Sequence, residues 1–360
     1  MPRKLAFTGG NQVEVVEYED RPLEPNELRI KTEYASGKHG TPLAMMGGLN
    51  YQGQRWDEEM RLFIPTEETA AEDRLAGGHI GTSGVGTIIE LGSDVSRWQI
   101  GNRVFGFMDV SETNIICAHR QTHWSGFPLW LDGGLWELGD LDPLVALCLE
   151  PAFVAFHCIR ESNVRFGDTV AVIGLGAIGL LAVRMAALGG AEQVFAVDPL
   201  PNRRQLATEF GANHVLDPFA EDAALKIHEL TGGAGVDVAI EISGKIPALQ
   251  TAIRATRMEG TVCAAGLYQG QAQDLWLGRE WHFNRLTMIA PHGCFGGHKP
   301  RDFSRWDEYR AYDCIVSMMH QGRLTAPDLI QPLVTLDEGP EVWRLIEHHP
   351  EEVVKFGVRF

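Results

Sequence analysis

Residues 169–198 read TVAVIGLGAIGLLAVRMAALGGAEQVFAVD, and this stretch decides the fold. An apolar run with strand character, residues 169–173, leads into a turn whose three glycines fit the pattern G-x-G-x-x-G. A segment of helical periodicity follows, and a second apolar run, residues 193–197, ends in Asp198. This order predicts the first βαβ unit of a dinucleotide-binding domain, and the alternative is a glycine-rich turn in some other βαβ unit.

Each glycine of the turn has a predicted physical task. Gly174 permits the tight turn, Gly176 lets the backbone approach a pyrophosphate, and Gly179 lets the helix pack closely on the strand. Ala177 and Ile178 lie in the first turn of the predicted helix. Because a helix N-terminus presents backbone N–H groups and the positive end of a dipole, we expect this turn to hold the phosphates.

The acid that closes the second strand predicts the type of cofactor. Asp198 lies 24 residues after Gly174, where a carboxylate can accept both ribose hydroxyls. Since the same carboxylate would repel a 2′-phosphate, NAD is predicted rather than NADP. Pro199 and Arg203 are further candidate cofactor contacts. Arg203 and Arg204 also weaken the preference for NAD, unless they are solvated charges in the first turn of the next helix.

The composition excludes several functional classes. A chain of 360 residues is long enough for two domains, and its net charge of −17 makes nucleic acid or an anionic membrane an unfavourable partner. The six cysteines include no C-x-x-C pair, which argues against a structural zinc lobe and a disulfide framework. The N-terminus lacks the apolar core of a signal peptide, and no run of about twenty apolar residues occurs. We therefore expect a cytoplasmic protein that acts on a small molecule.

The remaining sequence predicts an α/β protein with two domains. Residues 1–35 and two glycine-punctuated runs, 82–91 and 104–108, read as strands of a small barrel-like domain. A short helix is expected near 57–62 and a long buried helix over 143–159. The chain ends in helices over 307–321 and 340–348 and a strand over 353–360. A doubly wound parallel sheet is predicted from strands at 169–173, 193–197, 214–216, 236–241, 261–265 and 286–290.

Three further segments resemble motifs of one enzyme superfamily. ELRIKTEYASGKHGTPL (27–43) resembles a segment ending in G-x-C-G-T-D. GTSGVGTIIELGSDVSRWQIGNRVFG (81–106) resembles a G-H-E segment and the G-D-R-V strand after it. LEPAFVAFHCI (149–159) resembles the pattern E-P-L-x-V-x-x-H-A. With the glycine turn, these segments resemble the medium-chain dehydrogenase/reductase superfamily, in its zinc-type alcohol and polyol dehydrogenase branch.

The resemblance implies a GroES-like catalytic domain of the β-barrel type, residues 1–155 and 292–360, and a Rossmann domain, residues 156–291. It also implies an NAD-dependent oxidoreductase that interconverts a secondary alcohol and a ketone on a sugar, cyclitol or polyol. Members of the family are commonly dimers or tetramers joined through the edge of the nucleotide-binding sheet. The strand at 286–290 is the expected edge, and a homodimer or homotetramer is therefore expected.

The departures from the family concern its catalytic zinc. His39 stands at the position of the first cysteine ligand, Thr82 at that of the histidine, and Ser83 at that of the following glutamate. The later acidic position, Glu150, survives, so His39 and Glu150 alone would leave two zinc positions to water or to His79. Because zinc prefers four Cys, His, Asp or Glu ligands, no tightly bound catalytic zinc is predicted, even if His79 adds one ligand.

Without a metal, side chains must move the hydroxyl proton and stabilise an alkoxide. His39 is the predicted acid/base, because an imidazole titrates near neutral pH. Thr41 stands where family members carry a relay hydroxyl, and Glu150 is expected to orient the substrate or to pair with His39 or Lys38. Lys38 is the other candidate base or electrophile. Alternatively, His39 and Thr41 are ordinary turn residues and Lys38 is an exposed lysine. Glu150 would then be a first-turn acid that interacts favourably with the helix dipole.

Main-chain segments at the carboxyl ends of other strands are expected to contact the cofactor. These segments contain Ser243, then Gly266 and Leu267, then Pro291 and His292. His292 is also a second candidate acid/base, and a loop histidine is the plainer interpretation.

Three tryptophans and one insertion bear on the substrate. Trp124, Trp130 and Trp136 suit a sugar platform, and they also suit the core or a subunit contact. Residues 51–74 exceed the family norm, which is typical of a segment that shapes substrate choice or of a plain surface loop. Two other functions stay open: a zinc-free quinone or enoyl-type reductase, and an inactive NAD-binding sensor or scaffold.

Overall fold

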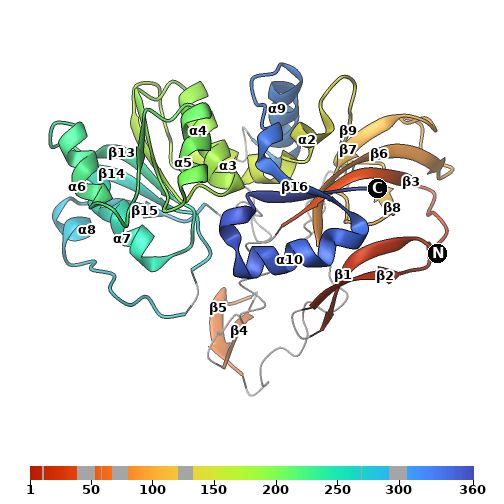
Figure 1. Cartoon of the computed structure of the whole chain (residues 1–360), viewed down its shortest axis with the longest axis horizontal. Helices are drawn as coiled ribbons and strands as arrows, with labels where there is room; N and C mark the ends of the chain where they lie inside the picture. The colour runs from red at the N-terminus through yellow and green to blue at the C-terminus, as the bar shows by residue number, and fades with distance from the viewer. Residues whose placement is uncertain are drawn as a thin grey trace.

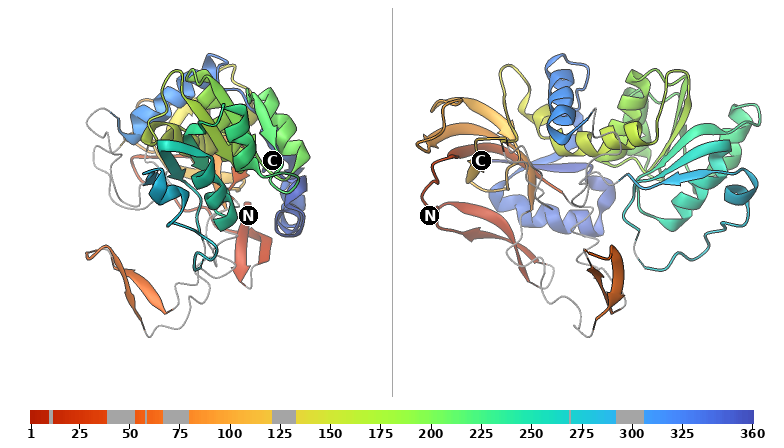
Figure 2. Two further views of the ribbon diagram at one scale, coloured as in Figure 1. Left: turned by 90° about the vertical axis from the view of Figure 1, so that its left-hand side faces the viewer. Right: turned by 180° about the vertical axis from the view of Figure 1, so that it is seen from behind.

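The computed structural model describes residues 1–9, 12–38, 53–57, 59–66, 80–120, 133–268, 270–291 and 306–360. These residues form two lobes, each built around one large sheet (Figure 1). The view from behind shows the same separation (Figure 2). Helix α3 (Leu149–Glu161) lies between the lobes, because it contacts helix α4 (Ala177–Leu188) of one and strand β6 (Gly81–Leu91) of the other.

The six strands of the first sheet all run parallel, in the order β12-β11-β10-β13-β14-β15. The order reverses beside β10, which has β11 on one side and β13 on the other. This is the Rossmann arrangement, so the predicted doubly wound sheet is confirmed, with β15 at the expected edge. The strands are β10 Thr169–Ile173, β11 Gln193–Val197, β12 His214–Leu216, β13 Val236–Glu241, β14 Thr256–Ala264 and β15 Thr287–Ile289.

Alternate residues of the central strands face two different hydrophobic cores. Val170 and Val172 of β10 pack with apolar residues of α3 and α4. Ala171 and Ile173 pack on the opposite face with helices α6 and α7. Both faces of the sheet are thus covered, which explains the nearly continuous apolar runs of its strands. The remaining helices of this lobe are α5 Pro201–Glu209, α6 Ala223–Leu230, α7 Ile246–Ala255 and α8 Glu280–Phe283.

The second sheet joins the two ends of the chain. Its order is β16-β17-β3-β6-β7-β9, and β8 also pairs with β3. The last strand, β17 (Lys355–Arg359), lies antiparallel to β3 (Glu27–Gly37), so residues far apart in sequence share one sheet. Three of its strands were not predicted from the sequence. These are β8 Thr113–Cys117, β9 Leu135–Glu137 and β16 Ile330–Thr335, whereas β6 and β7 (Arg103–Gly106) were.

The predicted short helix at 57–62 is wrong. Strands β4 (Gln54–Asp57) and β5 (Leu62–Pro65) form an antiparallel hairpin there. The rings of Trp56 and Phe63, which are paired across the hairpin, meet edge to face with centroids 5.2 Å apart. Cross-strand aromatic pairing outweighs the weak helical periodicity of this charged segment.

The predicted long helix at 143–159 is divided in two. Helix α2 covers Pro143–Ala146, and α3 begins at Leu149. The Asp142 side chain caps α2 by accepting a hydrogen bond from the Leu144 N–H at 2.8 Å. A continuous apolar run hides such a break, because both helices are buried and periodicity alone does not separate them.

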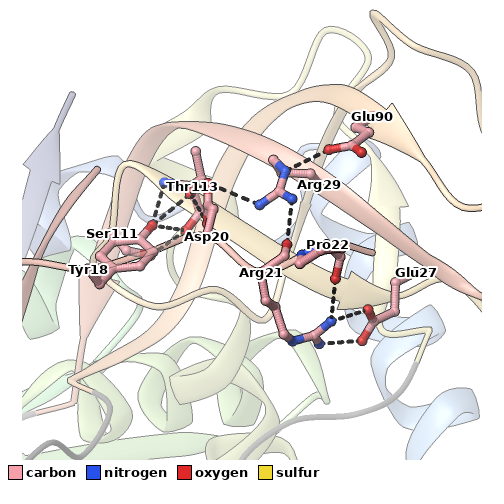
Figure 3. A network of polar contacts seen from close by, with 9 residues as sticks. All are labelled: Tyr18, Asp20, Arg21, Pro22, Glu27, Arg29, Glu90, Ser111 and Thr113. Atoms are coloured by element: carbon pink, nitrogen blue, oxygen red, sulfur yellow. Dashed lines mark hydrogen bonds and ion pairs between the residues drawn. The ribbon is translucent and has the colours of Figure 1, made fainter. Parts of the chain in front are cut away.

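A polar network fastens the N-terminal segment to the second sheet (Figure 3). Buried Arg29 donates from Nε to Glu90 at 2.8 Å and from Nη2 to the Arg21 carbonyl at 2.8 Å. Its Nη1 lies 3.0 Å from an Asp20 carboxylate oxygen. Arg21 donates hydrogen bonds to both carboxylate oxygens of Glu27, at 2.6 Å each. The network holds the chain between the hairpin of β1 (Arg3–Gly9) and β2 (Gln12–Glu17) and strand β3.

The C-terminal segment supplies two amphipathic helices to the second lobe. Helix α9 (Glu308–His320) packs on α3, and α10 (Gly339–His348) lies near β2. Short 3₁₀ turns cover Pro327–Leu329, Leu336–Glu338 and Pro350–Glu352. Within the described residues, every helix is too short or too polar to cross a bilayer.

Candidate active site

The glycine turn after β10 has the geometry that its sequence predicts. Gly174 adopts φ +93°, and a Cβ there would lie 2.8 Å from the Ser243 nitrogen. A Cβ on Gly179 would lie 1.9 Å from the Gly174 carbonyl oxygen, so only glycine lets α4 approach this closely. At Gly176, by contrast, no described heavy atom lies within 4 Å of the position of a Cβ. Gly176 is also the N-cap of α4 and offers no side chain to its first turn.

Asp198 ties the glycine turn to the end of β11. One carboxylate oxygen of this buried side chain accepts from the Leu175 N–H at 2.8 Å. The other accepts from the Leu200 N–H at 2.9 Å. Since a carboxylate has about four acceptor positions, these two bonds leave capacity for ligand hydroxyls. Pro199, next in the chain, is exposed.

The two arginines after Asp198 are not the solvated first-turn charges considered from sequence. Arg203 donates through Nη2 to the carbonyls of Pro350 and Val353, at 2.8 and 3.2 Å. Burial lowers the pKa of Arg203 below its ordinary value. Arg204 donates to the Asp198 carbonyl at 2.7 Å and pairs with Asp217 at 3.1 Å. Both guanidinium groups therefore hold protein oxygens.

The loops after β13 and β14 meet beside this turn. Ser243 and Leu267 are exposed, and the position of a Cβ on Gly266 lies 2.3 Å from Gly244. Buried Glu241 connects the two loops through hydrogen bonds. Sequence reasoning missed Glu241, although an acid that ends the apolar strand VDVAIE before a glycine turn was a usable signal. Pro291, which was predicted as a cofactor contact, is buried at the end of the described segment after β15.

Lys38 and Glu150, the acid matched from sequence to a zinc-ligand position, form an ion pair. The Lys38 Nζ lies 2.9 Å from Glu150 Oε1, and the side chains are 19% and 9% exposed. Lys38 directly follows β3, where its N–H donates to the Ile80 carbonyl at 3.1 Å. Glu150 lies in the first turn of α3. The pairing of Glu150 with Lys38, one of the sequence alternatives, is confirmed.

A second lysine, not foreseen from sequence, lies behind this pair. Lys355 of β17 is 3% exposed, and its Nζ donates to the Gly37 carbonyl at 2.9 Å. Burial lowers the pKa of Lys355, whereas the charge of Glu150 acts to raise it. Lys355 thus holds the end of β3 just before Lys38.

The hydroxyls at two other predicted ligand positions, Thr82 and Ser83, bond to the protein itself. Thr82 Oγ1 donates to the Ser36 carbonyl at 3.5 Å, and fully buried Ser83 accepts from the Glu150 N–H at 3.4 Å. Neither hydroxyl is a usual zinc ligand, and Lys38 already balances the Glu150 charge. The described donor set therefore does not fit a four-ligand zinc site. Within the described part of the chain, the one metal-capable cluster is exposed and distant in sequence: His349, Glu351 and Glu352.

Several predicted residues lie outside the described residues: His39, Thr41, His79, Trp124, Trp130 and His292. Trp136 is described and belongs to the core, with its Nε1 donating to Asp313 at 2.7 Å. His157 is buried at 2% exposure, with its ring against that of Phe153. An open hollow of about 460 Å³, lined by residues 218–223 with Thr251 and Arg254, contains none of the predicted site residues.

Comparison with known proteins agrees with this architecture. The family described as zinc-binding dehydrogenase matches residues 177–310. D-guloside 3-dehydrogenase of Escherichia coli strain K12 is 35% identical over 361 aligned positions, covering 99% of this chain and 100% of that protein. The structure of 2R,3R-butanediol dehydrogenase from Bacillus subtilis is similar with a TM-score of 0.74 at 24% identity, covering 100% of both chains. A zinc-binding dehydrogenase structure from Sinorhizobium meliloti 1021, bound to NADP, has a TM-score of 0.71 at 22% identity, covering 100% of this chain and 99% of the other.

Proposed function

Because the chain belongs to the medium-chain dehydrogenase/reductase superfamily, we propose that it oxidises a secondary alcohol of a glycoside or related polyol with NAD and without catalytic zinc. It is an oxidoreductase that acts on an alcohol group. The proposal that the mechanism needs no zinc rests on the Lys38–Glu150 ion pair, at 2.9 Å. A zinc-type relative would need a free carboxylate at this position.

The glycine turn supports a nicotinamide dinucleotide as the cofactor. The open space at Gly176 admits a pyrophosphate against the start of α4, and Asp198 has acceptor capacity for ribose hydroxyls. NAD is preferred to NADP because the Asp198 carboxylate disfavours a 2′-phosphate. Arg203 and Arg204, which could otherwise neutralise such a phosphate, are engaged with protein oxygens. When bound, the nicotinamide accepts a hydride from the substrate carbon.

The side chains of this chain handle the proton. As the hydrogen on the alcohol carbon leaves with the bonding electrons as hydride, the hydroxyl proton must pass to a base, and the carbon–oxygen double bond of the ketone forms. His39 is the proposed base and Thr41 the proposed relay. Lys38, held by Glu150, donates a hydrogen bond to the oxygen as negative charge develops on it. In the reverse direction the same groups return the proton to the alkoxide.

The relative whose name specifies a guloside suggests the substrate class. That protein is similar over 99% of this chain, so a ring hydroxyl of a hexoside is the first substrate to test. Copies of the chain are proposed to associate as homodimers or homotetramers through the edge strand β15. Exposed Trp276 and Phe283, at 49% and 74%, belong to the segment that precedes it.

The test combines turnover with metal content. Purified protein is assayed for NADH formation at 340 nm on gulosides, glucosides, cyclitols and acyclic polyols, before and after chelation. We expect turnover of a glycoside with NAD, unchanged by the chelator, with far less than one zinc per chain. One zinc per chain together with chelator-sensitive turnover would contradict the zinc-free mechanism. NAD binding without turnover of any alcohol would favour the sensor function instead.

A further inference from the structure

Glu241 is a fully buried carboxylate that the proposed chemistry does not use. It ends strand β13, directly beside β10, where the strand order of the parallel sheet reverses. In sheets of this type the ligand lies beyond the carboxyl ends of the strands at that reversal. A buried acid at this place therefore needs an explanation.

Hydrogen-bond donors from two loops surround the carboxylate. Oε1 accepts from both the N–H and the hydroxyl of Ser243, the N–H at 2.8 Å. Oε2 accepts from the Gly244 N–H at 3.3 Å and from the Tyr268 hydroxyl at 2.5 Å. The Glu241 carbonyl also accepts from the N–H groups of Ala265 and Gly266, at 2.8 and 3.1 Å. One residue thus binds the loop after β13 to the loop after β14.

The two loops are packed without spare room. A Cβ on Gly266 would lie 2.3 Å from the Gly244 backbone and 2.8 Å from Glu241 Oε2. Gly244 itself adopts φ +71°, a conformation that favours glycine. The Ser243 nitrogen, in turn, is the atom that forbids a Cβ on Gly174. A shift of the Glu241 carboxylate would therefore move both loops against the glycine turn.

The protonation states agree with this arrangement. Burial raises the pKa of Glu241, and hydrogen bonds from Ser243 and Tyr268 oppose that rise. Burial also raises the pKa of Tyr268, and the nearby Glu241 carboxylate raises it further. Tyr268 consequently remains a protonated donor to Glu241.

We propose that Glu241 is a positioning residue, which sets the loops at 243–244 and 265–268 at the spacing needed by the nicotinamide end of the cofactor. This role rests on the proposed function, because it assumes that a nicotinamide dinucleotide binds at the strand-order reversal. Glu241 acts through the loops and does not itself touch the cofactor.

The test is Glu241→Gln, with Asp237→Asn as the matched control. Glutamine keeps the shape of the side chain but turns one acceptor into a donor among four donors. Asp237 is the second residue of the same strand, and its carboxylate accepts from the Thr169 N–H at 2.8 Å and from Arg257 Nε at 2.6 Å. Dissociation constants for NAD and NADH, KM, kcat and melting temperature are measured for both variants.

We expect Glu241→Gln to raise the dissociation constant and KM for NAD roughly 10- to 100-fold, the loss typical of a site displaced by about 1 Å. Asp237→Asn is expected to lower the melting temperature and leave both constants unchanged. Equal cofactor affinity in wild type and a folded Glu241→Gln variant would overturn the inference, as would an equal loss in both variants.

If Glu241→Gln does not fold, Tyr268→Phe provides the same test. It removes one donor and keeps the carboxylate, and a several-fold rise in the NAD dissociation constant is expected. An unchanged constant in Tyr268→Phe would overturn the inference. Failure of the wild-type protein to bind NAD or NADH would instead overturn the proposed function, since that result does not depend on any variant.

Discussion

The substitution Gly176→Ala separates cofactor binding from folding. A methyl group at this position meets no described heavy atom within 4 Å, so it should not disturb the packing of the turn. Gly176 is the N-cap of α4, and alanine is a poorer N-cap residue than glycine, so the substitution itself is expected to cost up to about 1 kcal/mol of folding stability. The same methyl would project into the open space where the pyrophosphate is proposed to approach the backbone.

The neighbouring substitution Gly179→Ala has the opposite character. Its Cβ would lie 1.9 Å from the Gly174 carbonyl oxygen, whereas real contacts of this kind stay above 3.0 Å. Helix α4 or the turn must therefore move by about 1 Å or more, which typically costs about 1–3 kcal/mol of folding stability. Affinity for the cofactor should fall as well, because the turn itself is displaced.

The assay follows NAD binding by calorimetry and unfolding by denaturant titration for both variants. Gly176→Ala should weaken NAD binding about tenfold, equivalent to about 1.4 kcal/mol, and should lower the unfolding midpoint less than Gly179→Ala does. Gly278→Ala, another glycine with open space and an ordinary φ, is the control and should change neither quantity. Undiminished NAD affinity in Gly176→Ala would refute the placement of the pyrophosphate against this turn.

Two other perturbations test the proton site and the polar network. Lys38→Met should lower kcat roughly 10²-fold with little change in NAD affinity, since it removes the cation paired with Glu150; an unchanged kcat would exclude Lys38 from the chemistry. The hydrogen bonds from Arg21 hold the pKa of Glu27 below its ordinary value, so this pair stabilises the fold above the unfolded-state pKa, and the contribution disappears as pH falls through the lower folded-state pKa. Melting temperatures measured between about pH 6 and pH 3 should therefore fall less steeply for Arg21→Met than for wild type, and parallel curves would contradict this linkage.

The parallel sheet was predictable because the apolar strand pattern of each segment agrees with its place in the observed sheet. Strands β10, β11, β12 and β13 have the predicted bounds, since each is a short apolar run between turn residues. Strands β8, β9 and β16 were missed because each is short and its pairing partner lies outside the local sequence window. Strand β16 pairs with β17 across the intervening helix α10, and β8 pairs with β3, much earlier in the chain, which no local pattern encodes.

The site could be predicted where a single residue type at a given spacing indicates its own role. The glycines and Asp198 follow from spacing, and the Lys38–Glu150 pair was among the alternatives. Glu241 and Lys355 were missed for a common reason: each is a buried charged residue whose role appears only with its partners. A strand pattern predicts that such a position is buried, but it does not reveal the loop donors or the carbonyl that form hydrogen bonds with the charged group.

The survival of Glu150 at a zinc-ligand position does not require zinc. Removing one partner of a buried charge group is costly, because the remaining charges lose their compensation. Glu150 lies 2.9 Å from the Lys38 ammonium, and its charge also favours the protonated form of buried Lys355. Without this acid, the Lys38 ammonium would lose its partner where little water screens it, and Lys355 would lose the charge that favours its protonated form. Glu150 therefore has a structural role that does not depend on zinc, as do Thr82 and Ser83, which support the strand and the start of α3.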